Sequence, residues 1–329
     1  MLPVPLLARP KEVDVAYVLF IHGLDNKPEQ KYLHDLWLRK LAFSDGVDLI
    51  TNGVTSAMAY WANVLYEAPD ANLAAYEAVD SGLETLGAGD VLEAPGPLDL
   101  EGVSETQAAS IRRLAARLGV DPGVADDTLP PPEELTLVRL ERLPVPDWLR
   151  RRIMGRFVRD AHHYFYNESF SPRLNETYRV RDVLRSRFID GLRAAASQGP
   201  VVVVSHSMGT VIAYDCLMHE PDCPAIDGLI TIGSPLGLDE VQTFFPGYMR
   251  ANAFPAAKLN GPWVNVFDPL DVVAGLDPLL ANDYQSGGRA QIEDLREDNW
   301  GTWRHSISKY LQGKQLRTRL AQMLQVTWP

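Results

Sequence analysis

Short apolar runs rich in β-branched residues recur along the chain and are separated by segments with helical periodicity. Runs of this length and composition are typical of strands that are buried on both faces of a parallel sheet. They lie at residues 15–21, 201–204, 230–232 and 263–267. Because strands alternate with helices, we predict an α/β fold with a mostly parallel, doubly wound sheet.

Two segments repeat apolar residues at the spacing of one helical face. The first starts at Lys31, and the second runs from Tyr178 to Ala195. Their apolar positions are Leu33, Trp37 and Leu41 in the first, and Val180, Val183, Leu184, Phe188 and Leu192 in the second. Right-handed crossovers would pack both helices on the sheet and bring reactive groups to the carboxyl ends of its strands.

The segment between Glu67 and Asp147 differs in charge from the rest of the chain. It holds 17 acidic and 5 basic residues, and so accounts by itself for the net charge of −12. Because no basic face is left to neutralise phosphates, we expect no nucleic-acid binding. Ser104, with Gln107 three residues later and Gly119 at the end, predicts one short capped helix here.

A basic amphipathic helix is predicted over residues 146–159. Leu149, Ile153 and Phe157 share its apolar face, and Tyr164 continues that face. The helix could be a mobile lid that offers this face to lipid substrates. It could instead be a cap helix docked on the core, with its arginines paired with the acidic segment. We favour the docked helix because amphipathic helices mostly pack against a core.

These patterns divide the chain into three parts. Residues 1–66 would form the N-terminal half of the core, residues 67–175 an acidic and partly helical cap insertion, and residues 176–329 the C-terminal half of the core. His162 and His163 in the insertion lack the carboxylate or cysteine spacing of a metal site. We therefore expect neither a metal nor another cofactor.

The valine run ends in Ser205-His206-Ser207-Met208-Gly209, which we interpret as a sharp turn from a strand into a helix. Such a turn exposes its central serine as a nucleophile, and it needs small residues two positions before and after that serine. Ser205 and Gly209 meet this need. The alternative is an ordinary turn whose serine caps the helix, but the order of partner residues further along the chain favours a nucleophile.

A serine nucleophile needs an imidazole base, and the base needs a carboxylate to fix its tautomer. In the known enzymes whose nucleophile turn this one resembles, the acid and then the histidine follow the serine in sequence. Of the two downstream histidines, His219 lies in the helix after the turn, so we assign His305 as the base. Asp268 and Asp271 compete for the acid after strand 263–267. We favour Asp271, and expect Asp268, which precedes a proline, to shape the turn.

The strand at residues 15–21 runs directly into His22-Gly23-Leu24. In this arrangement the loop after the strand and the residue after the nucleophile each offer a backbone N–H to the developing oxyanion. By position these are the N–H groups of Leu24 and Met208, with His22 shaping the loop by hydrogen bonding. The residues that we expect at the substrate are His22, Gly23, His206 and Tyr164.

With these residues in place, the chain resembles the α/β-hydrolase superfamily, in particular lipase-like members with a His-Ser-x-Gly-Thr turn. The resemblance rests on His22-Gly23, residues 205–215, Gly233-Ser234-Pro235, the Asp271 loop and His305. It implies the α/β-hydrolase fold with a helical cap, and a Ser-His-Asp hydrolase of esters, thioesters or amides without a metal. A carboxylic ester or thioester is the substrate we expect, while acyl transfer and amide or peptide cleavage by the same triad stay open.

The remaining composition suggests an ordinary soluble globular protein. No stretch approaches 18 uninterrupted apolar residues, so no membrane span is expected, and the first residues lack the features of a signal peptide. Two cysteines, Cys216 and Cys223, do not make a disulfide framework. Two reduced cysteines fit a cytoplasmic protein, which is the location that we predict. The resemblance implies a small acyl substrate, with lipids among the candidates.

Overall fold

A six-stranded parallel sheet forms the centre of the molecule. The computed structural model describes residues 16–71, 73, 100, 104–120, 147–245, 253–301 and 303–328. The strand order is β10-β7-β6-β5-β1-β2, and each neighbouring pair is parallel. The strands are β1 (Tyr17–Ile21), β2 (Ser56–Ala59), β5 (Val201–His206), β6 (Gly228–Ile232), β7 (Trp263–Phe267) and β10 (Ile292–Arg296). This confirms the predicted doubly wound α/β architecture.

Alternate residues of each strand feed two separate hydrophobic clusters, because side chains in a strand point to opposite faces of the sheet. In β1, Leu19 and Ile21 join one cluster, and Val18 and Phe20 join the other. The first cluster includes α7 (Val180–Ala196) and α8 (Met208–His219), and the second includes α1 (Gln30–Ala42), α10 (Ile307–Tyr310) and α11 (Lys314–Leu324). The sheet is thus covered by helices on both faces.

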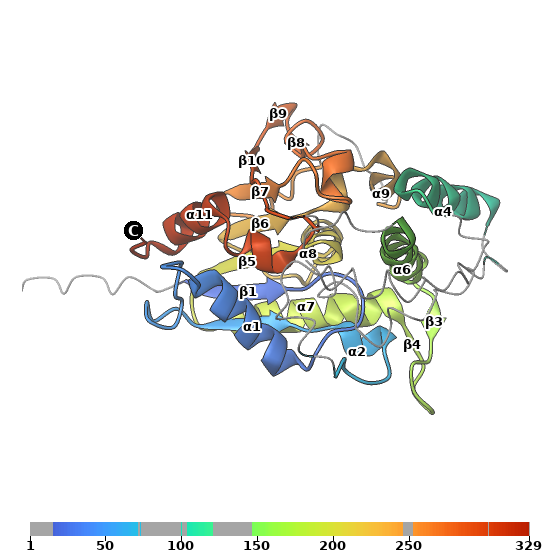
Figure 1. The fold of residues 1–329 in the computed structure, drawn as a ribbon, viewed down its shortest axis with the longest axis horizontal. Coiled ribbons are helices and arrows are strands. Elements are labelled where there is room, and N and C mark those ends of the chain that lie inside the picture. The colour runs from blue at the N-terminus through green and yellow to red at the C-terminus, as the bar shows by residue number, and fades with distance from the viewer. Residues whose placement is uncertain are drawn as a thin grey trace, which may run out of the picture.

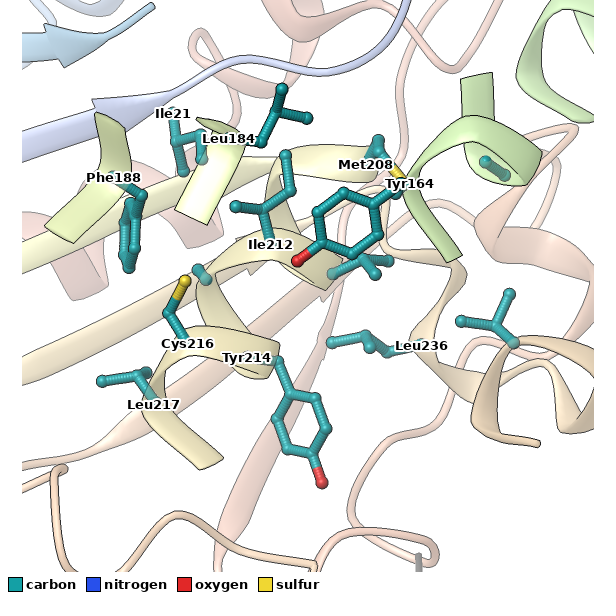
Figure 2. Packing of buried hydrophobic residues seen from close by; sticks show 14 of the residues in the cluster. Ile21, Tyr164, Leu184, Phe188, Met208, Ile212, Tyr214, Cys216, Leu217 and Leu236 are labelled. Atoms are coloured by element: carbon teal, nitrogen blue, oxygen red, sulfur yellow. The ribbon is translucent and has the colours of Figure 1, made fainter. Parts of the chain in front are cut away.

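Helix α8 is buried over its first ten residues, which fits a helix that lies between the sheet and other helices. Figure 2 shows its side chains, Ile212 among them, in one packed group with Ile21 of β1, Leu184 of α7 and Tyr164 of α6 (Asp147–Tyr166). Since this helix starts directly after Ser207, its packing fixes the place of the turn that carries the serine.

Two helices of the predicted cap insertion are described, α4 (Glu105–Leu118) and α6. Figure 1 places both beyond the end of the sheet toward which the strand arrows point. Helix α4 has the predicted start and stop: Ser104 and Gln107 form a capping box, and Gly119 ends the helix at φ 73°. The short strands β3 (Ser169–Phe170) and β4 (Tyr178–Arg179) form an antiparallel pair next to α6.

Some helix and strand boundaries in the structure differ from those predicted from the sequence. The helix predicted from Tyr178 begins at Val180, because Tyr178 and Arg179 pair with β3 instead. The shorter elements are α2 (Ala62–Leu65), α9 (Asp239–Gln242), η2 (Pro235–Gly237), η4 (Ala274–Leu276), β8 (Gln285–Ser286) and β9 (Arg289–Ala290). Much of residues 67–146 lies outside the described residues, so the limits of the cap remain a prediction.

Cys216 and Cys223 are both buried free thiols. In the described part of the chain, no helix combines the length and apolar character that crossing a bilayer requires.

Candidate active site

Ser207 sits at the apex of a sharp turn between β5 and α8. Its backbone has φ 52° and ψ −125°, a left-handed φ that is rare for a residue with a side chain and costs about 1–3 kcal/mol. The Ser207 N–H donates to the carbonyl of Ile232 at 3.0 Å, which ties the turn to the neighbouring strand. The turn is therefore held from outside as well as by the local chain.

The residues two positions before and after the serine, Ser205 and Gly209, lie in tightly packed surroundings. A Cβ at Gly209 would lie 2.6 Å from the carbonyl oxygen of His22 and 2.7 Å from that of Ile21, both backbone atoms that cannot move away. Ser205, which replaces the usual glycine, donates its hydroxyl to the Ile230 carbonyl at 2.9 Å. The extra side chain at residue 205 is therefore buried with its hydrogen bond satisfied.

Three side chains from distant parts of the chain form one hydrogen-bonded line. The Ser207 hydroxyl lies 2.9 Å from Nε2 of His305, and Nδ1 of His305 lies 2.8 and 2.9 Å from the two carboxylate oxygens of Asp271. All three residues are buried. Because a carboxylate only accepts, the network assigns the ring proton to Nδ1 and leaves the lone pair of Nε2 toward the serine.

Asp271 is held as a carboxylate by its surroundings. The N–H groups of Val273 and Ala274 donate to its Oδ1, and the Tyr310 hydroxyl donates to its Oδ2 at 2.8 Å. Burial by itself would raise the pKa of Asp271, but the charge and hydrogen bond of His305, together with these donors, hold that pKa below its ordinary value. A charged acid beside the imidazole is what a rising positive charge on His305 requires.

Asp268, the other acid candidate, serves a different purpose. It does not reach His305; its oxygens accept from the N–H groups of Leu270 and Asn299, each at 2.7 Å, and from Arg304 at 3.1 Å. It is fully buried and joins the loop after β7 to the segment before His305. These contacts agree with the role in shaping the turn that we expected for Asp268 from the sequence.

The loop after β1 lies directly against the serine. A Cβ at Gly23 would approach the Cβ of Ser207 to 2.7 Å, so only glycine fits here. Within the described residues, the N–H of Leu24 and the N–H of Met208 form no hydrogen bond. Both groups are thus open to bind another atom, as an oxyanion hole requires.

His22 does not face the serine but holds this loop from behind. The Trp61 N–H donates to its Nε2 at 3.0 Å, and its Nδ1–H donates to the Gly23 carbonyl at 2.7 Å. Burial, with Lys27 as the next cause, lowers the pKa of His22 to about 3, so its ring is neutral near pH 7. The ring also stacks on the Trp61 indole, with centroids 4.7 Å apart.

A cavity of about 40 Å³ opens at the serine. Gly23, Leu24 and His206 line it among the residues expected at the substrate. Its other lining residues are Asp25, Lys27, Leu33, Leu36, Trp37, Met154, Arg156, Phe157, Ser207, Val273, His305 and Ile307. Most of these side chains are apolar, and three of them come from α6.

His206 adds a second neutral imidazole to the cavity wall. Its Nε2–H donates to the His305 carbonyl at 3.2 Å, and the two rings lie 4.9 Å apart. Burial, and next the neighbouring His305, lowers the pKa of His206 well below its ordinary value. Its Nδ1 is left as an acceptor on the side of Gly23.

Tyr164 lies elsewhere. Its hydroxyl donates to Asp215 of α8 at 2.6 Å, and Figure 2 shows its ring in the apolar group between α6 and α8. Neither Tyr164 nor His22 lines the cavity at the serine. The structure thus gives Tyr164 a packing role, because the apolar face of α6 turns this ring toward α8 and away from Ser207.

Two further features of α6 lie near its C-terminal end. His162, His163 and Glu168 offer three ligand atoms within 4.8 Å of one another, although Nδ1–H of His163 already donates to Glu168 at 3.0 Å. A second cavity, of about 230 Å³, is lined by Leu65, Tyr66, Arg156, Arg159, Asp160, His163 and Phe170. Arg156 borders both cavities.

Sequence reasoning missed several residues at the site. Tyr310, which binds Asp271, reads as an ordinary position of a short helix. Arg156 was expected to pair with the acidic segment, but it pairs with Asp25, the residue after Leu24. No local signal marks such a pair, because its two members are 131 positions apart.

Comparison with known proteins agrees with the fold. Residues 169–327 match a model of the alpha/beta hydrolase family. A comparison with curated proteins found no match. The matched segment contains β5, α8, β6, β7 and β10, and the parallel sheet continues outside it through β1 and β2. The match covers just under half of the chain, and together with the parallel sheet it shows the alpha/beta hydrolase fold and supports the alpha/beta hydrolase superfamily.

Proposed function

We propose that this protein is a serine esterase that hydrolyses carboxylic esters of short apolar acyl groups through an acyl-enzyme. The single observation that carries the proposal is the line from Ser207 through His305 to Asp271, with hydrogen-bond distances of 2.9 and 2.8 Å. Oriented in this way, the three groups can activate a hydroxyl that is otherwise a weak nucleophile.

The first half of the reaction forms the acyl-enzyme. Ser207 Oγ attacks the ester carbonyl carbon while Nε2 of His305 takes the hydroxyl proton. The carbonyl π electrons move onto the oxygen, which becomes an oxyanion. As the tetrahedral intermediate collapses, the bond to the alkoxy group breaks and His305 gives its proton to the departing alcohol. Asp271 stabilises the imidazolium throughout without becoming protonated.

The second half returns the free enzyme. A water molecule takes the place of the alcohol and attacks the acyl carbon, with His305 again as the base. The second tetrahedral intermediate collapses with Ser207 as the leaving group, and the proton returns to its oxygen. Thioesters would follow the same steps, and an alcohol in place of water would make the enzyme an acyltransferase.

The N–H groups of Leu24 and Met208 would bind the oxyanion in both steps. Loss of one such donor in other enzymes costs about 2.7–4 kcal/mol of barrier, so their direction matters. His22 supports that direction, because the Gly23 carbonyl it binds belongs to the same peptide group as the Leu24 N–H. In a trans peptide these two groups point in opposite directions, so a hydrogen bond to one fixes the other.

The size and lining of the cavity support a short acyl group. A space of about 40 Å³ holds roughly a few water molecules, so a short acyl chain fits it best while α6 keeps its position. Leu33, Trp37 and Phe157 present apolar walls to that chain. A small apolar acyl group meets both limits.

Labelling with a fluorophosphonate probe tests the nucleophile. We expect the wild-type protein to be labelled and to hydrolyse p-nitrophenyl acetate and butyrate, and Ser207→Ala to lose both properties. Ser234→Ala is the matched control, because Ser234 is also buried and its hydroxyl contacts Thr210 one turn into α8. Undiminished labelling of the Ser207→Ala protein would overturn the proposal.

Product analysis with an added alcohol separates hydrolysis from acyl transfer. Free acid as the main product is the expected result. Transfer of the acyl group to the alcohol as the dominant reaction would keep the triad and replace the esterase assignment.

A further inference from the structure

The backbone around Leu24 is fixed on both sides. Its own N–H belongs to the peptide group whose carbonyl, on Gly23, binds His22. The next peptide group has its carbonyl, on Leu24, bound by Nζ of Lys27 at 2.5 Å, and its N–H, on Asp25, bound by Oδ2 of Asp160 at 3.2 Å. Because two rigid peptide planes meet at one Cα, fixing both planes fixes the direction of the Leu24 N–H.

Of these contacts, the one with Asp160 comes from a helix that is distant in sequence. It lies on α6, 135 positions from Asp25 in sequence, and is buried with 2 % exposure. Asp25 has φ 72°, a left-handed conformation that needs support from its neighbours, although aspartate tolerates it better than most residues. The support for this strained residue therefore depends on α6.

A second residue of α6 binds the side chain of Asp25. Nη1 of Arg156 lies 3.1 Å from Oδ1 of Asp25, and the two side chains are 5 % and 3 % exposed. The Tyr66 hydroxyl lies 3.0 Å from Asp25 Oδ1 and 3.2 Å from Asp160 Oδ2, and Arg159 binds both Tyr66 and Asp160. Two buried carboxyl groups thus lie against two guanidinium groups.

These contacts join the cap to the catalytic loop at one point. We propose that Asp160 and Arg156 are positioning residues for the oxyanion hole: by holding Asp25 they direct the N–H of Leu24, so that docking of α6 completes the site. This inference rests on the proposed esterase function. It assigns to α6 a part in the reaction that differs from enclosing the substrate.

Asp160 gives the sharper test, because it does not line the cavity at Ser207. In Asp160→Ala the acceptor for the Asp25 N–H is lost, and we expect kcat for p-nitrophenyl acetate to fall tenfold to about a hundredfold, as for other small displacements of reacting groups. KM should stay within about twofold. Asp160→Asn keeps an oxygen at this position and should recover most of kcat.

Affinity for a boronic acid distinguishes a positioning role from a merely structural one, because a merely structural role would leave this affinity unchanged. A boronate adds to the Ser207 oxygen and places an oxygen in the oxyanion hole, so its Ki should rise in parallel with the loss of kcat. If Asp160→Ala does not fold, Arg156→Met gives the second test, with kcat and boronate Ki compared.

Asn167→Gly is the matched control. Asn167 directly follows the last residue of α6 and binds Asp182 of α7 at 2.9 Å, so the variant also removes a contact between this segment and the core. Its φ of 52° suits glycine. We expect kcat and boronate Ki of this variant to match the wild type.

The outcomes separate the two proposals. Equal effects of Asp160→Ala and Asn167→Gly, or a change in KM alone, would overturn the positioning role while an active enzyme labelled at Ser207 leaves the esterase intact. A wild-type protein that is neither active nor labelled would overturn both.

Discussion

Asp268 and Asp271 show how position within one loop separates two chemically identical side chains. Both are buried, but Asp271 receives the His305 ring, whereas Asp268 receives two backbone N–H groups and Arg304. Tyr310 connects them, because its hydroxyl accepts from the Asp268 N–H and donates to the Asp271 carboxylate, each at 2.8 Å. Asp271 is therefore the residue that we propose as the acid of the triad, while Asp268 holds the loop in place.

Substitution by asparagine should separate these roles. Asp271→Asn removes the charge that stabilises the imidazolium and allows the wrong ring tautomer, and we expect kcat for p-nitrophenyl acetate to fall by about 10⁴ while the fold persists. Asp268→Asn should keep kcat within about tenfold but unfold at a lower urea concentration, because Arg304 loses its charged partner. Similar kinetic losses in both variants would remove the assignment of Asp271 as the acid.

At the scale of elements, helix α6 both lines the cavity at Ser207 and contacts the loop after β1. One stretch of it contributes Met154, Arg156 and Phe157 to the cavity wall, and the following turns contribute Asp160 to the loop after β1 and Tyr164 to the contact with α8. The three functions lie on successive turns of one rigid helix. A change in the position of α6 would therefore alter the cavity and the loop together.

Phe157 lines the cavity at Ser207, and under the proposed function we expect it to limit the length of the acyl chain. In Phe157→Ala we expect the preferred p-nitrophenyl ester to shift from acetate or butyrate toward hexanoate or octanoate. Each methylene that enters the new space should add about 0.8 kcal/mol, or roughly fourfold in kcat/KM. Phe170→Ala, next to the second cavity, is the control and should leave the chain-length profile unchanged. An unchanged profile in Phe157→Ala would place the acyl chain elsewhere.

At the scale of the whole molecule, several histidines are folded into surroundings that keep them neutral. Burial is the main cause that lowers the pKa of His22 to about 3, that of His163 to about 4, and that of His206 well below its ordinary value. The unfolded chain protonates these rings near pH 6.5. Between that pH and the lowered values the unfolded state binds more protons, so stability rises with pH.

Acid should therefore weaken the fold through these histidines from about pH 6.5 downward. From pH 6.5 down to pH 5, we expect the free energy of unfolding in urea to fall by up to about 1.4 kcal/mol per pH unit for each such histidine. The raised pKa of Asp160 acts in the opposite direction, because the folded state then binds the extra proton. His163→Gln should lessen the slope by roughly one histidine. The same slope in this variant and the wild type would contradict the neutral state of His163.

The sequence predicts the sheet because its signals are local. The runs at β1, β5 and β7, and the capping pattern around α4, each lie within a few residues. The line from Ser207 to His305 and Asp271 was proposed from the order of residues and has the expected contacts, while the roles of these groups stay predictions. The cluster around Asp25 could not be predicted, since a buried arginine reads in sequence like an exposed one.

The placement of β5 between β1 and β6 has a consequence for any shortened form of this chain. A fragment limited to residues 169–327 would keep the serine, the imidazole and the aspartate, but one long side of its valine-rich strand would have no neighbour. An unpaired strand edge can form hydrogen bonds with a strand of another chain. Such a fragment should therefore self-associate rather than stay monomeric. The early segment that supplies Gly23 and Leu24 also contains β1, which covers this edge of β5.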